Sequence, residues 1–192
     1  MTVRIIAITV VMVLYGALAY ADECNSLRYV DNGNGTVIDC RSGLTWLKNA
    51  NCLDIVNGVD KSGGSLTWYA AMDWAAGLGN GLCGLSDGSL AGDWRLPTKT
   101  EMMAMIASAK KQGFTMPILT NAPGTAKWSN GNLFDNVLNN NYWTATTHTS
   151  ETSAWYVSLY NGSVDYYVKN GMIYVWPVRV RQFVTFGDVS VE

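Results

Sequence analysis

Residues 93–101 read Asp93-Trp94-Arg95-Leu96-Pro97-Thr98-Lys99-Thr100-Glu101 and mark the start of a helix. Pro97 fixes the backbone at the entry, Thr98 is a suitable N-cap, and Glu101 three residues later completes a capping box. Apolar side chains then recur on one helix face, namely Met102, Met105, Ile106 and Ala109. Gly113 offers a C-terminal stop. We expect the methionine-rich face of this helix to lie in the core rather than to line an adaptable binding groove.

A second helix is expected upstream of this segment. Thr67 is a plausible N-cap, and Gly77 and Gly79 end the pattern. One face carries Trp68, Ala71, Ala75 and Leu78. Still earlier, the β-prone runs 28–30 and 36–38 flank the turn-forming residues 31–35, which predicts a hairpin, and residues 44–47 predict a further strand.

The C-terminal part of the chain changes to strand patterns. Four β-prone runs are expected to be strands, at residues 142–145, 154–160, 164–169 and 173–180. Asn161-Gly162 and Asn170-Gly171 are the turns between the later runs. Within residues 154–160, alternation places Trp155, Val157 and Leu159 in the core and Tyr156, Ser158 and Tyr160 on an exposed face. The predicted helices and strands together indicate a domain of mixed α and β structure.

The N-terminus indicates export. Residues 1–21 start with one cation, Arg4, continue through an apolar run and end in Ala19-Tyr20-Ala21, which is typical of a cleaved signal peptide. The apolar run is shorter than the roughly 20 residues of a bilayer span, so we expect no membrane span in the mature chain. Cleavage after Ala21 leaves a single domain over residues 22–186 and a fraying tail over residues 187–192. We expect a periplasmic, cell-surface or extracellular location.

Four cysteines follow the signal peptide, at Cys24, Cys40, Cys52 and Cys83. An even number of cysteines in an exported chain predicts two disulfides, for which three pairings are open. We favour Cys24–Cys40, which closes the N-terminal hairpin, and Cys52–Cys83, which brackets the first helix. Buried free thiols are the alternative.

The groups that usually carry catalysis are sparse. The chain has a single histidine, His148, in a polar loop, and it lacks the Gly-x-Ser-x-Gly pattern of a nucleophile elbow. Residues 31–39 place glycines where a calcium loop needs oxygen ligands, and the cysteines are assigned to disulfides, so we expect no metal and no cofactor. We therefore expect no enzyme activity, with a hydrolase centred on His148 as the weaker alternative.

Charge limits the partners further. Without Arg4 the chain has 12 cations and 15 carboxylates, a net charge of −3, and no basic run longer than Lys110-Lys111. Nucleic acid and anionic membrane surfaces are therefore poor candidates as partners.

Aromatic residues are abundant, with eight tryptophans and ten tyrosines. Exposed rings beside hydroxyl and amide groups suit the C–H faces and hydroxyls of sugars, and they equally suit a protein partner. The predicted ligand-binding residues lie on the C-terminal strands and their loops: His148, Tyr156, Tyr160, Tyr167, Lys169 and Trp176. We expect a binding module for a glycan or a surface protein. The alternative is a structural subunit that self-associates into a homo-oligomer or filament.

Seven short motifs occur in order along the chain. They are residues 29–39, Ser42-Gly43-Leu44-Thr45-Trp46, residues 66–71, residues 93–101, residues 142–146, residues 154–157 and Pro177-Val178-Arg179. Together they resemble the bacterial domain family typified by the C-terminal domain of the Legionella collagen-like adhesin. The resemblance spans about residues 28–182.

The resemblance implies an α+β, C-type-lectin-like fold, related to that of formylglycine-generating enzymes, with a small twisted antiparallel sheet, two helices and long loops. It also implies adhesion, since the adhesin's domain binds sulfated glycosaminoglycans. The net charge of −3 and the lack of a collagen-like repeat set this chain apart from the adhesin. No cysteine follows Cys83, so the enzymatic relatives share structure without implying activity. In the 93–101 motif, Arg95 is expected to pair with a carboxylate and Trp94 to fill the core.

Overall fold

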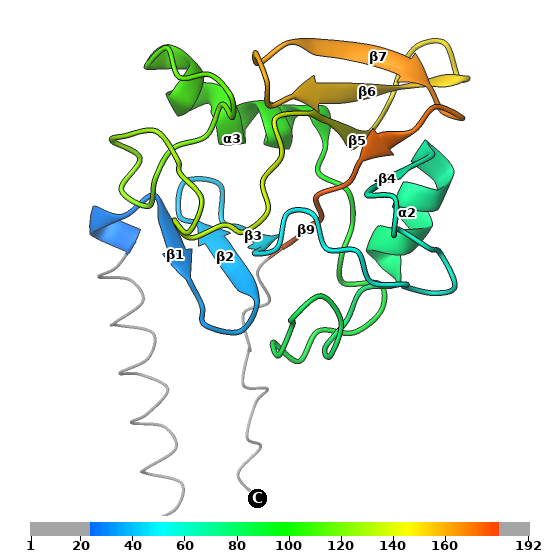
Figure 1. The fold of residues 1–192 in the computed structure, drawn as a ribbon, viewed down its shortest axis with the longest axis horizontal. Helices are drawn as coiled ribbons and strands as arrows, with labels where there is room; N and C mark the ends of the chain where they lie inside the picture. The colour runs from blue at the N-terminus through cyan, green and yellow to red at the C-terminus, as the bar shows by residue number, and fades with distance from the viewer. Residues whose placement is uncertain (1–23, 181–192) are drawn as a thin grey trace, which may run out of the picture.

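The computed structural model describes residues 24–180 as an α+β fold with two β-sheets and two helices of seven or more residues (Figure 1). The fold class expected from the sequence is confirmed. The proposed signal peptide, residues 1–21, and the proposed tail, residues 187–192, lie outside the described residues.

The first sheet contains four antiparallel strands in the order β1-β2-β3-β9. They are β1 (Tyr29–Asp31), β2 (Thr36–Asp39), β3 (Leu44–Leu47) and β9 (Val178–Val180). The predicted hairpin is confirmed, with Val30 opposite Ile38. Its turn approaches the loop after the first helix so closely that a Cβ at Gly35, where φ is +82°, would clash with the carbonyl oxygen of Gly84. Glycine is therefore required there by both conformation and space.

The second sheet has the order β4-β8-β5-β6-β7. Its strands are β4 (Ser65–Leu66), β5 (Asn141–Thr147), β6 (Ser153–Ser158), β7 (Val164–Val168) and β8 (Ile173–Tyr174). Strand β5 pairs with β8 in parallel, and the other neighbours are antiparallel. The expectation of one small antiparallel sheet is corrected in this respect.

The run of residues 173–180, expected to be one strand, divides between the sheets. Its first part, β8, lies beside β5, and its last part, β9, lies beside β3, with buried residues 175–178 crossing between them. Pro177 lies in the crossing segment, where its lack of an N–H disrupts no sheet pairing. Val178 also exchanges two backbone hydrogen bonds with Arg95, both of 2.9 Å, which attaches the segment before the second helix to the first sheet.

Both predicted helices are confirmed, with their caps. Helix α2 (Trp68–Ala76) follows Thr67, whose side chain accepts from the Ala70 N–H. Helix α3 (Lys99–Lys111) follows Thr98 and has the complete capping box with Glu101. The predicted apolar face of α3 is 2% exposed or less at each position: Met102, Met105, Ile106 and Ala109. Helix α3 packs on β5 and β6, and α2 lies beside β4 and β5 (Figure 1).

Tryptophan forms much of the core. Five indoles are at most 1% exposed, namely those of Trp46, Trp74, Trp94, Trp143 and Trp176. Two of these indole N–H groups donate to carbonyl oxygens of segments distant in the sequence, from Trp74 Nε1 to Asp54 at 2.9 Å and from Trp143 Nε1 to Leu66 at 2.9 Å. Such rings fill volume and satisfy buried carbonyls together. The tryptophan abundance therefore largely reflects packing rather than a binding surface.

The two favoured disulfides are both present, Cys24–Cys40 and Cys52–Cys83. The second spans a sequence separation of 31 residues that includes α2, so it joins the loops on either side of that helix. Loop-closure entropy assigns such a bridge roughly 3–4 kcal/mol of stabilisation. Within residues 24–180, neither helix has the length and apolar character needed to cross a bilayer.

Candidate binding site

A group of aromatic rings lies on one face of the β6–β7 hairpin. The hairpin register places Trp155 of β6 directly opposite Tyr166 of β7, and their rings meet edge to face at 5.7 Å between centroids. His148, from the loop after β5, stacks on Tyr166 at 3.8 Å with an interplanar angle of 19°. Lys99, in the first turn of α3, places Nζ 3.9 Å from the centroid of the Trp155 ring. We call these four residues the hairpin aromatic cluster.

Local hydrogen bonds fix the cluster in place. The Ser150 N–H donates to Nδ1 of His148 at 3.1 Å, so a neutral His148 carries its proton on Nε2. The His148 N–H donates to the Ser153 carbonyl, and the Lys99 N–H donates to Oγ1 of Thr146 at 2.9 Å. Tyr166 remains 47% exposed, whereas His148 and Trp155 are half-buried. The cluster is therefore preorganised, with one ring still largely open to solvent.

The opposite face of the hairpin carries a second aromatic group. Nζ of Lys169 lies 4.4 Å from the Trp68 ring centroid and 5.7 Å from that of Tyr69. Tyr167 of β7, which alternation places on the face opposite Tyr166, is 51% exposed. On this face Tyr156 is opposite Asp165, and burial together with the charge of Asp165 raises the pKa of the Tyr156 hydroxyl.

The predicted ligand-binding residues are thus divided among several places. His148 belongs to the hairpin aromatic cluster, Tyr156 and Tyr167 lie on the opposite face, and Tyr160 is 52% exposed just after β6. Lys169 is 8% exposed because its amine packs on Trp68.

The prediction that Trp176 is exposed is wrong. Trp176 is fully buried and donates from Nε1 to the Leu47 carbonyl at 2.8 Å. Its ring contacts Trp46 and Phe134, because residues 175–178 cross between the two sheets through the core. We therefore remove Trp176 from the candidate site.

Sequence reasoning missed three members of the cluster, namely Lys99, Trp155 and Tyr166. Trp155 was expected in the core but is half-buried, and Ser158, expected on the exposed face, is 4% exposed. A signal for the cluster does exist in the sequence. Pairing outward from an Asn161-Gly162 turn places Trp155 and Tyr166 on the same face of the hairpin, but it sets Trp155 opposite Val168. The structure shifts this register by two residues and brings Trp155 opposite Tyr166. Lys99 has no comparable signal, because it reaches the cluster through tertiary packing.

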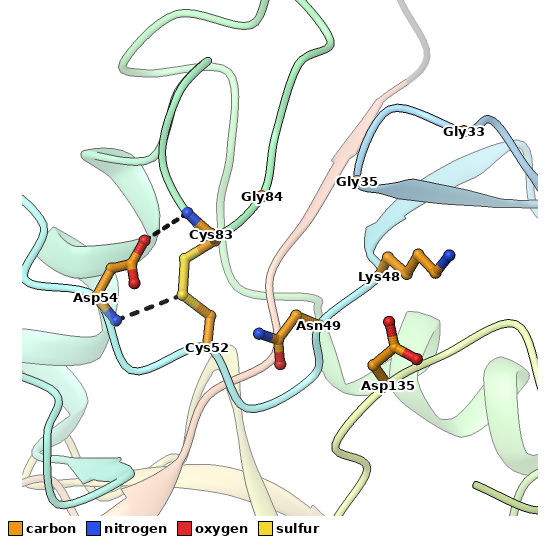
Figure 2. A pocket seen from close by; sticks show the side chains of 9 residues that line it. All are labelled: Gly33, Gly35, Lys48, Asn49, Cys52, Asp54, Cys83, Gly84 and Asp135. Atoms are coloured by element: carbon orange, nitrogen blue, oxygen red, sulfur yellow. Dashed lines mark hydrogen bonds between the residues drawn. A yellow bond between two sulfur atoms is a disulfide. The ribbon is translucent and has the colours of Figure 1, made fainter. Parts of the chain in front are cut away.

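A polar pocket of about 440 Å³ lies between the β1–β2 turn and the loop after α2 (Figure 2). Figure 1 shows these two segments at the end of the molecule away from β7. It is lined by Gly33, Gly35, Lys48, Asn49, Cys52, Asp54, Cys83, Gly84 and Asp135. Nζ of Lys48 contacts a carboxylate oxygen of Asp31 at 2.6 Å, and the hydrogen bond from Lys48 to Asp31 raises the pKa of this amine.

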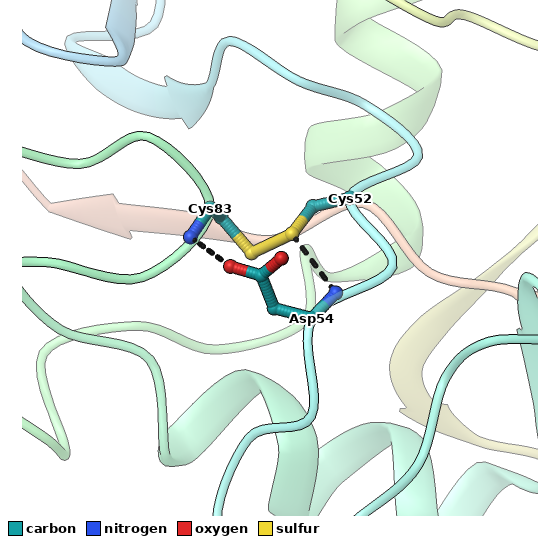
Figure 3. Close-up of side chains that lie close together, drawn as sticks. All are labelled: Cys52, Asp54 and Cys83. Atoms are coloured by element: carbon teal, nitrogen blue, oxygen red, sulfur yellow. Dashed lines mark hydrogen bonds between the residues drawn. A yellow bond between two sulfur atoms is a disulfide. The ribbon is translucent and has the colours of Figure 1, made fainter.

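Cys52, Asp54 and Cys83 bring three potential metal-ligand atoms close together beside this pocket (Figure 3). Both sulfurs are joined in the disulfide and offer no thiolate to a metal. Asp54 instead accepts from the Cys83 N–H at 2.6 Å, and its own N–H donates to Sγ of Cys52 at 3.4 Å. These contacts support Cys83 at a positive φ of 54°, so we interpret Cys52, Asp54 and Cys83 as a structural contact between two loops.

The comparison with known families identifies this chain. No curated protein matches it. The family model described as the Lcl C-terminal domain matches residues 35–179, from the turn of the first hairpin to β9, in agreement with the resemblance drawn from the motifs. The chain therefore belongs to the Lcl C-terminal domain family, named for the C-terminal domain of the Legionella collagen-like protein.

Proposed function

We propose that this protein is an exported adhesion module that recognises a glycan through the hairpin aromatic cluster. The family is adhesin-associated, and two disulfides favour an extracytoplasmic location. The observation that carries the proposal is the preorganised group of three rings and one amine beside a hydroxyl-rich loop, Thr147, Thr149 and Ser150. Rings stack on sugar C–H faces, while the amine, the His148 Nε2–H and loop hydroxyls supply hydrogen bonds.

The same geometry favours binding over catalysis. A catalytic histidine needs a nucleophile on one ring nitrogen and an orienting group on the other. Here the Nδ1 of His148 accepts a backbone N–H, and its ring is held between Tyr166 and Trp155. We keep the C-type-lectin-like relationship as part of this proposal, supported by the α+β architecture and the motif resemblance.

Alanine at Tyr166 tests the proposal. The substitution removes the exposed ring and the support beneath His148, and we expect about tenfold weaker glycan binding, equivalent to about 1.4 kcal/mol. The wild-type protein is first screened on a glycan array, and the affinities of variants for the best ligand are then measured by calorimetry. Tyr160→Ala is the matched control because Tyr160 is equally exposed but is not in the cluster.

Two outcomes contradict the proposal: equal weakening by both substitutions, or unchanged affinity in a folded Tyr166→Ala variant. Tyr167→Ala reports separately on the opposite face of the hairpin.

Self-association is the second candidate function, and the free edge of the second sheet favours it. Strand β7 pairs on one side with β6, and Tyr166, Tyr167 and Val168 are each about half exposed. The carboxylate of Asp165 accepts from the Tyr166 N–H at 2.8 Å, which occupies one edge donor and places a charge there. Sedimentation across a concentration series separates the candidates, because a persistent monomer rules out assembly through β7.

A further inference from the structure

The polar pocket is built by segments far apart in the sequence (Figure 2). The β1–β2 turn contributes Gly33 and Gly35, and the loop after α2 contributes Gly84. A Cβ added at Gly33 or Gly84 would meet no atom within 4 Å, so these backbone positions border open space. The turn is held by a 3.0 Å hydrogen bond from the Lys48 N–H to the Gly35 carbonyl. Glycine main chain therefore forms one part of the pocket, and polar side chains form the rest.

The lining offers both hydrogen-bond donors and acceptors. Oδ2 of Asp54 accepts from the Cys83 N–H, which leaves Oδ1 available, and within residues 24–180 the Asp135 carboxylate accepts no hydrogen bond. Oδ1 of Asn49 accepts from Asn136, which leaves the Nδ2 donor of Asn49. A hydroxyl group both donates and accepts, so paired carboxylate and amide groups suit polyhydroxyl ligands, whereas a bare cation would use acceptors only.

One wall of the pocket is less polar. The Cys52–Cys83 disulfide lines it, as Figure 2 shows, between Asn49 and Asp54. Cys52 and Cys83 are only 2% and 6% exposed, so the disulfide fixes this wall and offers little surface of its own. The volume of about 440 Å³ falls within the range of small-molecule sites, roughly 300–1,000 Å³.

The net charge of the pocket determines which class of sugar it favours. The ammonium group of Lys48 is already paired with Asp31 at 2.6 Å. The charge of this amine also interacts with that of Asp135. The three carboxylates of Asp31, Asp54 and Asp135 together outnumber the one ammonium group, so the pocket has a net negative charge, which disfavours sulfated or carboxylated sugars and favours neutral or amino sugars.

We propose that this pocket is a second glycan site, which takes a neutral or amino sugar residue between Asn49, Asp54 and Asp135. It goes beyond the proposed function of the hairpin aromatic cluster and does not depend on it. The ligand's hydroxyls donate to the two carboxylates and accept from Nδ2 of Asn49.

Amide NMR of the full mature protein tests the proposal with simple glycosides. The probes are methyl glycosides of glucose, galactose, mannose and glucosamine, with glucose 6-sulfate as the anionic comparison. We expect at least one neutral or amino probe to shift the amide signals of Gly33, Gly35 and Gly84, and glucose 6-sulfate to leave them unchanged. Tyr166→Ala should leave these shifts intact, which separates this site from the hairpin aromatic cluster.

Substitutions then test the polar contacts. Asp135→Asn keeps the shape and removes one charge, and we expect affinity to fall about fivefold. Asp73→Asn, an equal change on the exposed side of α2, is the control and should leave affinity unchanged. The proposal is overturned if no probe shifts the pocket glycines at millimolar concentration, if the sulfated probe binds more tightly, if both variants bind equally, or if a chelator abolishes binding.

Discussion

Replacing Glu101 with glutamine tests how α3 is attached to the first sheet. Oε2 of Glu101 accepts from the Thr98 N–H at 2.7 Å and from Nη1 of Arg95 at 2.8 Å, and its Oε1 accepts from Nη2 of Arg95 at 2.7 Å. Arg95 in turn exchanges backbone hydrogen bonds with Val178 of β9. One carboxylate therefore joins the helix cap to a strand from the far end of the chain.

Glutamine retains one acceptor oxygen and places an N–H₂ group against a donor. Hydrogen bonds to charged groups contribute roughly 1.5–3 kcal/mol, but the side chains of Arg95 and Glu101 are 36% and 24% exposed, so solvent screening reduces this. We expect Glu101→Gln to lower the free energy of unfolding by about 1–2 kcal/mol, and the melting temperature by about 3–6 °C for a domain of this size.

The pH dependence of this stability difference provides an internal check. Burial raises the pKa of the Glu101 carboxyl, but the hydrogen bonds from Arg95 and Thr98 and the Arg95 charge outweigh it, so the pKa is lowered overall. A lowered pKa in the folded state stabilises the protein above the unfolded-chain value of 4.5, and this contribution disappears as pH falls through the folded value. The difference in the free energy of unfolding between wild type and Glu101→Gln should be fully present at neutral pH and should shrink below pH 4.5.

Urea unfolding at neutral and acidic pH measures the effect. Glu151→Gln makes the same chemical change in an exposed turn and serves as the control. A Glu101→Gln variant as stable as this control, or a stability difference that persists unchanged in acid, would refute the reasoning.

Two further predictions concern buried charge and close backbone approach. Burial lowers the pKa of the Lys61 amine to about 8, below its ordinary 10.5, so the charged amine destabilises the folded protein below pH 8. The free energy of unfolding should therefore rise by about 3 kcal/mol between pH 8 and pH 10.5. Urea unfolding should show this rise in the wild type and not in Lys61→Met. Gly35→Ala should lower the free energy of unfolding by about 2 kcal/mol more than Gly33→Ala does, as measured by thermal unfolding. Both glycines have a positive φ, but only a Cβ at position 35 clashes with the Gly84 carbonyl. Equal losses of stability in the two variants would contradict this.

Features that depend on neighbouring residues were predictable. The capping box of Thr98 and Glu101, the hairpin around residues 31–35 and the helix begun by Thr67 depend on contacts within a few positions of the chain. Both disulfides followed the same logic, because each closes a loop around one local unit.

Features that depend on which distant segment covers a surface were not predictable. Tyr166 and Trp176 are both aromatic residues in β-prone runs, but Tyr166 lies at a sheet edge and Trp176 in a crossing between two sheets. Lys169 looked exposed by its charge, but Trp68 of α2 covers it.

The sequence by itself determined the local elements, because short-range contacts encode them, and its ordered motifs determined the family. It left three disulfide pairings open and favoured the pairing that the structure shows. Only the tertiary structure decided the two-sheet arrangement, the burial of Trp176 and the meeting of Lys99 and His148 at Trp155 and Tyr166. The physical reason is that burial depends on the other surfaces that compete for the same core, and this competition involves the whole chain at once.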